Sequence, residues 1–499
     1  MHRSHQDADP PARHVVVLGG GIAGLAAAHR LVATGLRVTL LEATDRLGGK
    51  LMTGEVAGVR VDLGAESVLA RRPEAVALAE AVGLSGRLQP PATATASLWT
   101  RDALRPMPTG HVMGVPGDPA ALGGVLSPEG LARIAEERDL TPTPVGDDVA
   151  VGAYVADRLG REVVDRLVEP LLGGVYAGDA YRISLRAAVP QLYEAVKEGG
   201  PLLEAVRRIQ ERAAARQQTG PVFQGLAGGI GTLPDAVADA VRAGGGESRT
   251  ETPVLGLTRN DTGWAVRTDT GMITADGIVL ATPAWSASAL LAAESPAAST
   301  ELAGVEYASM ALVTMAFRRA DIEAYEALRG RSGFLVPPVD GRTIKASTFS
   351  TNKWQWVADA APGLFVLRTS VGRYGEEEHL HREDGELVAV SLRDLREATG
   401  LAARPVDTEV TRWIGGLPQY PVGHHTRVAR IRDEVAKLPA LRVCGAVYDG
   451  VGIPACVASA QRAADEIAGD LAGPGTGKIT NEIIATPTLV RGTESEAGQ

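Results

Sequence analysis

HVVVLGGGIAG, residues 14–24, is the stretch that decides the fold of this chain. Its first five residues are mostly apolar, as in a strand buried inside a parallel sheet. A Gly-x-Gly-x-x-Gly turn follows and opens an Ala- and Leu-rich helix over residues 22–33, which Gly35 ends. A second apolar strand is expected at residues 37–41. Strand, tight turn, helix and strand in this order predict a βαβ unit of an α/β protein.

The glycine turn has the chemistry of a dinucleotide site. Gly19 permits the tight turn, Gly21 lets a pyrophosphate approach the backbone, and Gly24 lets the helix pack against the strand. The anion would lie on free N–H groups at the positive end of the helix. Glu42 ends the second strand, where a carboxylate can accept hydrogen bonds from a ribose hydroxyl. An acid rather than an arginine at this point disfavours a 2′-phosphate, which leaves FAD and NAD as the candidate ligands.

A second glycine-rich motif, ATDRLGGK at residues 43–50, comes directly after Glu42. It resembles the glycine-doublet motif of the flavin amine oxidase and protoporphyrinogen oxidase superfamily, and the resemblance implies FAD. Two adjacent glycines bring backbone N–H groups close to a cofactor, while Arg46 and Lys50 can offset the charge of a diphosphate.

A third motif, CGAVYDGVGIP at residues 444–454, ends a strand in glycines and leads into a helix. A second helix N-terminus is therefore available for the flavin end of FAD. In the superfamily that this motif resembles, the matching segment closes over the isoalloxazine ring.

Further segments resemble the protoporphyrinogen and coproporphyrinogen oxidase family, and in particular its Gram-positive coproporphyrinogen III oxidases. These segments are DLGAES at residues 62–67, EPLLGGVYAGD at 169–179, STFSTNKW at 347–354, TRWIGGLPQY at 411–420 and GVGIPAC at 450–456. The resemblance runs from about residue 14 to residue 471. One departure lies at Ala65-Glu66, where relatives often have Pro-Asp or Pro-Arg.

The resemblance implies a set of FAD contacts at the three motifs and the 64–67 loop. The implied contacts are Gly19, Gly20, Gly21, Ile22, Ala23, Gly24, Glu42, Ala43, Arg46, Lys50, Gly64, Ala65, Glu66, Ser67, Val254, Trp413, Val451, Gly452 and Ile453. No catalytic side chain is assigned, because flavin-centred hydride transfer does not strictly require one.

Cationic side chains near the flavin loop are candidates to bind substrate carboxylates. Arg71 is the first of them, since a guanidinium can hold a propionate in a bidentate pair, and Lys345 and Lys353 are weaker candidates of the same kind. We expect no metal site, because His424-His425 has no further ligands near it in the sequence and is better explained as a turn beside Gly423.

The implied activity is the oxygen-dependent oxidation of coproporphyrinogen III in haem biosynthesis, which removes six electrons and yields hydrogen peroxide. Protoporphyrinogen IX, with two propionates instead of four, remains the alternative substrate. A flavin amine oxidase is a more distant alternative, since that chemistry favours an aromatic cage and only 4% of the residues are aromatic. A non-catalytic FAD-containing tetrapyrrole carrier would show the same glycine motifs.

Composition excludes several other classes of protein. The 45% hydrophobic and 22% charged residues are those of a globular chain, and the net charge of −10 disfavours a nucleic-acid partner. Two cysteines cannot form a disulfide framework, and the longest apolar stretch, residues 15–28, is too short to cross a bilayer. We therefore expect a cytoplasmic protein, and leave open a peripheral membrane contact or a ferrochelatase contact.

The 499 residues should form about three domain-sized units. We predict a Rossmann-like FAD-binding fold built from residues 14–70, 220–285 and 411–472, and a mixed-sheet substrate domain from 71–117 and 286–410. A helical insertion, the candidate membrane or partner surface, is expected over 118–219. Residues 1–13 are expected to be a disordered tail, and residues 473–499 a flexible one.

Overall fold

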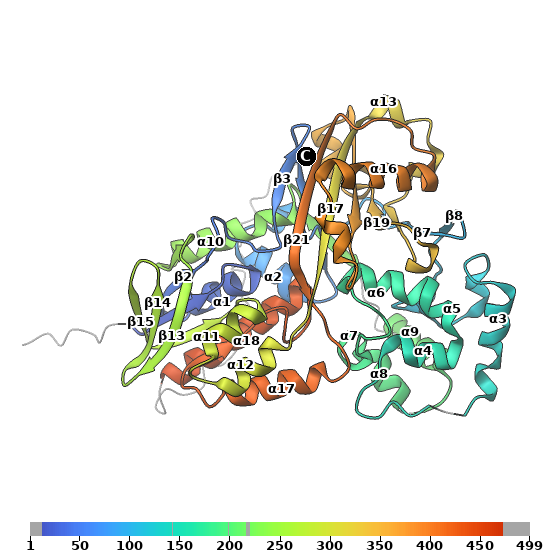
Figure 1. The fold of residues 1–499 in the computed structure, drawn as a ribbon. Helices are drawn as coiled ribbons and strands as arrows, with labels where there is room; N and C mark the ends of the chain where they lie inside the picture. The colour runs from blue at the N-terminus through green and yellow to red at the C-terminus, as the bar shows by residue number, and fades with distance from the viewer. Residues whose placement is uncertain (1–11, 142, 198, 216–219, 473–499) are drawn as a thin grey trace, which may run out of the picture.

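The computed structural model describes residues 12–141, 143–197, 199–215 and 220–472. The C-terminal tail predicted over residues 473–499 lies outside the described residues, as do residues 1–11 of the predicted N-terminal tail. Figure 1 shows three regions: a nucleotide-binding region around α1 and β2, an upper region around β17 and β21, and a helical region around α4 and α9.

A five-stranded parallel sheet forms the base of the nucleotide-binding region, in the order β12-β2-β1-β16-β22. Its strands are β1 (His14–Leu18), β2 (Arg37–Leu41), β12 (Glu247–Arg249), β16 (Gly277–Leu280) and β22 (Leu441–Val443). The central strand β1 is entirely buried. The strands come from three separated stretches of sequence, so the predicted Rossmann-like unit is assembled from distant parts of the chain.

Helices cover one face of this sheet, where Val15 and Val17 of β1 pack. They are α1 (Ile22–Val32), α2 (Pro73–Ala81), α10 (Leu233–Ala243) and α18 (Ile453–Ala472). Val16 and Leu18 point to the other face, which a small antiparallel sheet and three helices cover. These are β13 (Val254–Asn260), β14 (Gly263–Thr268), β15 (Met272–Ala275), α11 (Ala284–Leu291), α12 (Pro296–Ala303) and α17 (His424–Val435).

A seven-stranded mixed sheet forms the upper region, in the order β21-β17-β20-β19-β18-β7-β8. Its strands are β7 (Ala96–Thr100), β8 (Ala103–Pro106), β17 (Tyr307–Arg318), β18 (Gly333–Leu335), β19 (Ile344–Thr348), β20 (Leu364–Val371) and β21 (Asp407–Pro418). All neighbours are antiparallel except β18 and β7. Helix α16 (Asp384–Thr399) packs on one face through Leu387 and Leu395. Strand β21 runs across residue 411, where we predicted a domain boundary.

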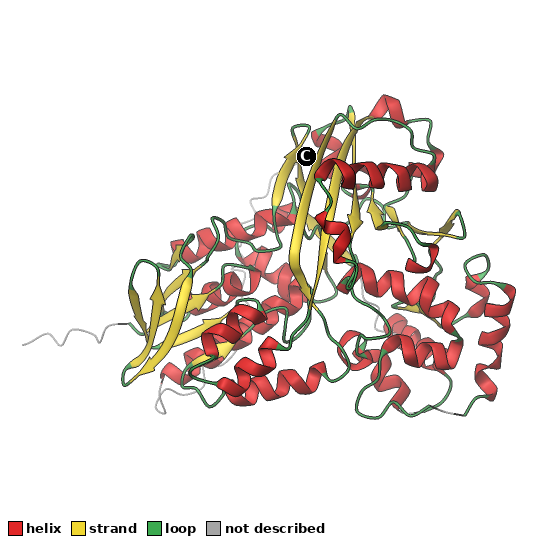
Figure 2. Cartoon of the chain, in the orientation of Figure 1, coloured by secondary structure: helices red, strands yellow, loops and turns green. Residues whose placement is uncertain are grey.

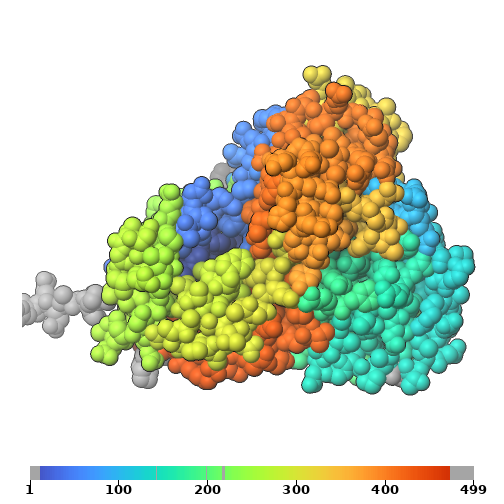
Figure 3. Space-filling model, viewed as in Figure 1, coloured from blue at the N-terminus to red at the C-terminus, as the bar shows by residue number. Residues whose placement is uncertain are grey.

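The helical insertion has its own apolar core, which includes Val155, Leu172, Leu192 and Val206. Its helices are α3 (Pro128–Ala135), α4 (Val151–Leu159), α5 (Arg161–Val163), α6 (Glu169–Tyr176), α7 (Leu185–Ala188), α8 (Pro190–Lys197) and α9 (Leu202–Ala215). A π-helical turn over Val164–Val168 joins α5 to α6. In Figure 3 this region, coloured teal, packs directly against the upper region. No helix within the described ranges is long and apolar enough to span a bilayer.

Shorter elements complete the three regions, and Figure 2 shows how helices, strands and loops are distributed over them. They include β3 (Thr53–Val56), β4 (Val59–Asp62), β5 (Val68–Leu69), β6 (Leu88–Gln89), β9 (His111–Val112), β10 (Val115–Pro116), β11 (Phe223–Leu226), α13 (Arg319–Ile322), α14 (Ser350–Lys353) and α15 (Gln355–Ala360). The predicted α/β fold with a mixed second sheet and a helical insertion is thus confirmed.

Candidate cofactor and substrate site

The first glycine turn forms an open cradle at the N-terminus of α1. Gly19 has a φ of +106°, and a Cβ on Gly24 would lie 1.8 Å from the Gly19 carbonyl oxygen, so neither position accepts a side chain. A Cβ on Gly21, in contrast, would meet no atom of the described chain within 4 Å. The backbone is therefore packed tightly where the helix meets the strand and open where a pyrophosphate would lie. This arrangement fits a dinucleotide.

Glu42 ties the end of β2 to the glycine turn. Its Oε2 accepts a hydrogen bond from Gly20 N at 2.7 Å, and its Oε1 accepts one from Thr44 N at 2.9 Å. Thr44 Oγ1 also donates to Oε1 at 2.9 Å, so about one of the four lone-pair positions of the carboxylate remains for a ribose hydroxyl. Thr252 N donates to the Glu42 carbonyl oxygen at 2.9 Å, which brings the start of β13 at Val254 to the same edge. Ala43 is exposed at this edge.

The glycine doublet packs against the first glycine turn. Gly48 N donates to the Gly20 carbonyl oxygen at 2.8 Å. Arg46 was predicted to offset diphosphate charge, but its Nη2 donates to the Gly49 carbonyl oxygen at 2.6 Å and its guanidinium lies 5.8 Å from the centre of a Trp413 ring. Arg46 thus holds the doublet and Trp413 together. Lys50 is exposed, and the structure describes no hydrogen bond or ion pair for its amine among the residues of the four ranges.

The 64–67 loop lies between Lys50 and Trp413. A Cβ on Gly64 would lie 2.1 Å from the Lys50 carbonyl oxygen and 3.1 Å from the Trp413 ring, so glycine is required here. Trp413 Nε1 donates to the Leu63 carbonyl oxygen at 3.0 Å, and Ala65 N donates to the Lys50 carbonyl oxygen at 3.2 Å. Ser67 at the end of the loop is half-buried. Three of the predicted cofactor segments therefore meet at one place.

Glu66 lies in the loop where the sequence departs from the pattern of the family that it resembles. Its side chain is buried and forms ion pairs with Lys353 and with Arg368, the latter at 3.2 Å. Burial alone would raise the pKa of Glu66, but the charges of Arg368 and Lys353 lower it to about 2. Arg368 also donates to the Gly64 carbonyl oxygen at 2.8 Å. The Glu66 carboxylate thus stabilises the loop through Arg368. Lys353, a predicted propionate ligand, is the second ion-pair partner of this carboxylate.

The glycine loop before α18, which holds Val451 and Gly452, is supported by stacked rings. Tyr420 OH donates to the Ala446 carbonyl oxygen, and His424 Nε2 lies 2.9 Å from the Val447 carbonyl oxygen. The two rings are 4.1 Å apart and 11° from parallel. Burial lowers the pKa of His424 to about 4, so the imidazole is neutral at pH 7.

Cys456 lies in the first turn of α18, which begins at Ile453. Its Sγ is 3.7 Å from the Gly450 carbonyl oxygen, and burial raises the pKa of the thiol to about 12. The thiol is therefore protonated at neutral pH and packs against the loop.

The predicted substrate cations lie in contrasting environments. Arg71 is exposed, and it has no hydrogen bond or ion pair within the part of the chain that the structure describes. Lys345 is buried on β19, with 7% of its surface exposed, and its Nζ lies 4.0 Å from Met310 Sδ. The structure therefore presents one free guanidinium at the surface and one enclosed amine.

Helix α6 leaves space between the helical insertion and the seven-stranded sheet. Gly173 is buried, yet a Cβ there would meet no described atom within 4 Å. A Cβ on Gly174 would lie 3.9 Å from Leu335 of β18. Val451 of the glycine loop before α18 packs against the same helical core as Leu335. The two glycines thus face a space that the sheet and the glycine loop border.

A cavity of about 450 Å³ opens between the helical insertion and the loops of the sheet. Its charged and phenolic lining consists of Arg161, Asp165, Glu169, Asp179, Tyr181, Arg373, Tyr374 and Glu376. Burial raises the pKa of Glu169 to about 7. This lining was not found from the sequence, because its members come from three separate segments.

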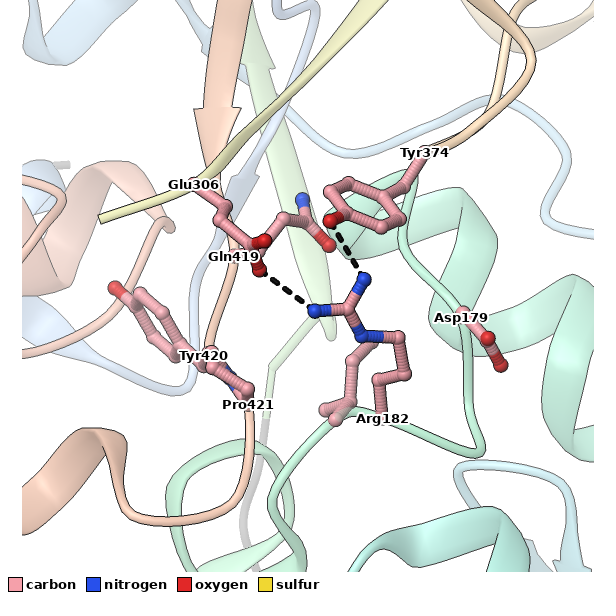
Figure 4. Close-up of a pocket in the computed structure, with 8 residues that line it drawn as sticks. Asp179, Arg182, Glu306, Tyr374, Gln419, Tyr420 and Pro421 are labelled. Atoms are coloured by element: carbon pink, nitrogen blue, oxygen red, sulfur yellow. Dashed lines mark hydrogen bonds and ion pairs between the residues drawn. The ribbon is translucent and has the colours of Figure 1, made fainter. Parts of the chain in front are cut away.

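Arg182 joins the helical insertion to the rest of the molecule, beside a small cavity of about 10 Å³ (Figure 4). Its Nη1 donates to Tyr374 OH at 2.6 Å, and its Nη2 donates to Glu306 Oε2 at 2.8 Å. The guanidinium also lies 4.6 Å from the centre of the Tyr374 ring. These contacts join the segment after α6 to the loop after β20 and to the start of β17.

The parallel sheet and its converging glycine turns define a dinucleotide-binding oxidoreductase. The family model described as flavin containing amine oxidoreductase matches residues 22–468, so the chain belongs to this family, and FAD is its cofactor.

Curated relatives and a solved structure match most of the chain. The coproporphyrinogen III oxidase of Mycobacterium leprae is 38% identical over 92% of this chain and 99% of its own length. That of Bacillus subtilis is 32% identical over 89% and 96%. A crystal structure from Exiguobacterium sp. 255-15, provisionally assigned as a protoporphyrinogen oxidase, is 34% identical, with a TM-score of 0.81 over 91% of this chain and 98% of that one.

Proposed function

We propose that this chain oxidises coproporphyrinogen III to coproporphyrin III, with FAD as the electron acceptor and dioxygen as the final oxidant. The observation that carries the proposal is the match to coproporphyrinogen III oxidases along nearly the full length of both chains. Six electrons leave the porphyrinogen in three two-electron steps, and three molecules of dioxygen become three of hydrogen peroxide. When bound, FAD supplies the hydride-accepting chemistry that side chains lack.

The chain's own residues would bind, orient and enclose the cofactor and the substrate. The cradle at Gly21 would hold the pyrophosphate, and Glu42 would hold the ribose end. The Trp413 ring, the loop at Gly64 and the loop at Val451 would hold the isoalloxazine. The remaining contacts predicted from the sequence belong to the same proposal.

The substrate would enter the space that Gly173 faces, between α6 and the seven-stranded sheet. Arg71 is an exposed cation without an ion pair among the described residues, and it can attract carboxylates to an acidic protein. Lys345 offers a second cation on the sheet side. Glu66 already compensates the charge of the Lys353 amine, so we place Lys353 in a supporting role.

Turnover tests the proposal directly. Under air, the FAD-loaded protein should convert coproporphyrinogen III to a fluorescent porphyrin, with three molecules of oxygen consumed and three of peroxide formed per porphyrin. Simple amines should produce no peroxide. Peroxide from amines together with an unchanged porphyrinogen would contradict the proposal, and so would binding without turnover.

Protoporphyrinogen IX is the second candidate substrate, favoured by the provisional assignment of the Exiguobacterium protein. The two substrates differ in charge, because two propionates of coproporphyrinogen III are vinyl groups in protoporphyrinogen IX. Comparing kcat/KM for the two decides between them, and we expect the higher value for coproporphyrinogen III.

We propose a cytoplasmic location, with a contact between the helical insertion and a ferrochelatase or the membrane surface. The resemblance supports this contact. Flotation with anionic liposomes tests the membrane contact, and co-sedimentation with a ferrochelatase tests the ferrochelatase contact. Protein found in neither fraction would contradict both.

A further inference from the structure

Lys345 is a buried amine without a carboxylate partner. Only 7% of its surface is exposed, and the one contact to its Nζ within the described part of the chain is Met310 Sδ at 4.0 Å. A thioether is a weak acceptor and carries no charge. Burying an ammonium group without a counter-ion costs several kcal/mol, so a lysine in this position is either neutral or awaits an anion.

A β-bulge takes Lys345 out of the regular register of β19. Across β19 and β20, Ile344 pairs with Val371 and Ala346 pairs with Ser370, which leaves Lys345 as the extra residue. Ile344 packs in the core beneath α16, on the opposite face of the sheet. Bulges re-aim side chains in this way and are frequent beside active sites.

The neighbours of Lys345 place its amine on the cofactor side of the sheet. Met310 lies on β17 next to Ala311, which points into the core beneath α16, so Met310 points to the other face. Met310 pairs with Trp413 of β21, whose indole contacts the Gly64 loop. The amine therefore lies on the face of the sheet that carries Trp413.

A permanent cation stands next to Lys345. Arg373 is also 7% exposed, donates to the Val336 carbonyl oxygen at 3.2 Å, and shares a 3.2 Å ion pair with Glu376. Burial, and then the charge of Arg373, lower the pKa of Lys345 to about 7, against the smaller opposing effect of Glu376. Arg373 thus has the partly exposed Glu376 as its ion-pair partner, whereas Lys345 forms no ion pair with a described residue.

We propose that Lys345 recognises a substrate propionate on the Trp413 face of the seven-stranded sheet, taking up a proton as the carboxylate enters and forming a buried ion pair with it. This inference rests on the proposed function and deepens it. A carboxylate at this position satisfies the amine, whereas a vinyl or ethyl group leaves it without a partner. Lys345 therefore favours a tetracarboxylate porphyrinogen over a dicarboxylate one.

Proton uptake gives the proposal a pH signature. An amine with a pKa of about 7 is about 90% neutral at pH 8, so binding should take up about 0.9 proton there and about 0.1 at pH 6. Affinity should be greatest below pH 7, and should fall up to tenfold per pH unit above it, because the amine must first be protonated.

Other charged groups face the same region, and their effects on the pH dependence must be distinguished from the effect of Lys345. Glu376 lies on the segment after β20 with Arg373. On the helical insertion, Glu169, Asp165 and Asp179 line the cavity that Arg373 also lines, with Arg161 beside them. Of these, Glu169 titrates in the same range, since its pKa is also about 7. A Glu169→Gln variant therefore tests whether the pH signature comes from the carboxylate instead.

The experiment is calorimetric titration of the FAD-loaded full chain with coproporphyrin III, which carries four carboxylates and is redox-stable. Titrations from pH 6 to pH 9, each in two buffers of different ionisation enthalpy, give the affinity and the protons taken up. Flavin absorption in each variant shows that the cofactor site is intact. Mesoporphyrin IX, with two carboxylates, is the comparison ligand.

Two substitutions at Lys345 separate charge from shape. Lys345→Met should weaken coproporphyrin binding about 30-fold or more at pH 6, abolish proton uptake at pH 8 and remove the preference over mesoporphyrin. Lys345→Arg restores a permanent charge, and should bind at pH 8 without proton uptake. Lys437→Met, at an exposed amine paired with Glu434, should behave as wild type.

The proposal is overturned if Lys345→Met keeps wild-type affinity and proton uptake, or if Glu169→Gln alone abolishes the uptake. In either case, continued turnover of coproporphyrinogen III by the wild type would leave the proposed function intact. Failure of the wild type both to bind coproporphyrin and to oxidise coproporphyrinogen III would remove the proposed function and this inference together.

Discussion

Replacing Glu66 by Gln removes the negative charge behind the Gly64 loop. The buried carboxylate pairs with Lys353 and Arg368, and Arg368 in turn donates to the Gly64 carbonyl oxygen at 2.8 Å. The amide of Gln cannot neutralise two cations in a site that is 8% exposed. We therefore expect the substitution to weaken both the fold and the cofactor loop.

The size of the effect follows from the pKa of Glu66. A carboxyl group whose pKa falls from 4.5 to about 2 is held in its charged form by about 3 kcal/mol. Breaking a buried ion pair by removing one partner costs 3–5 kcal/mol, which agrees. Because the folded-state pKa is the lower one, this stabilisation is present above about pH 4.5 and is lost as the pH falls towards 2.

Urea unfolding at pH 7, followed by protein fluorescence and flavin release, measures the effect. We expect the free energy of unfolding to fall by about 3 kcal/mol in Glu66→Gln, with weaker FAD binding. Glu434→Gln is the matched control, because its partner Lys437 is exposed and such pairs contribute at most about 1 kcal/mol. A Glu66→Gln protein as stable as this control, with normal FAD affinity, would refute the reasoning.

Three further substitutions test the cradle, the cleft and the flavin loop. Gly24→Ala places a Cβ 1.8 Å from a backbone oxygen and should yield protein without FAD; a normal ratio of flavin to protein would contradict the packing described. Gly173→Ala should raise the thermal midpoint slightly, since alanine is favoured in helices by about 0.5–1 kcal/mol. It should also raise KM, because the methyl group enters the space between α6 and the seven-stranded sheet. A lower thermal midpoint would show that this space is filled. Tyr420→Phe leaves the Ala446 carbonyl oxygen without its donor and should destabilise the glycine loop before α18 by about 1–3 kcal/mol, which would weaken FAD binding. Unchanged FAD binding would show that the Tyr420–His424 ring stack does not support the cofactor.

The nucleotide-binding unit was predictable because its signals are local. The strands at residues 14–18 and 37–41 agree with β1 and β2, since apolar runs and glycine turns identify such elements directly. Residues 272–280, in contrast, form two strands in different sheets, β15 and β16. The division lies at Asp276, whose carboxylate accepts a hydrogen bond from His14 N at 2.7 Å, and no local pattern reveals that contact.

The support behind the site was not predictable, because its partners are distant in sequence. Glu66 and Lys353 are separated by 287 residues, and neither Arg368 nor Arg373 lies in a recognisable motif. The sequence identified Lys345 and Lys353 as similar cations. The structure separates them, since one is paired with a carboxylate and the other is not. The individual FAD and propionate contacts remain predictions.

Anaerobic mixing of the FAD-loaded protein with coproporphyrinogen III tests the central claim most directly. One porphyrinogen can deliver six electrons and each FAD accepts two, so the flavin absorption should bleach completely at a third of an equivalent of substrate, and should return on admission of air. A flavin that stays oxidised with coproporphyrinogen III but bleaches with a simple amine would contradict the claim.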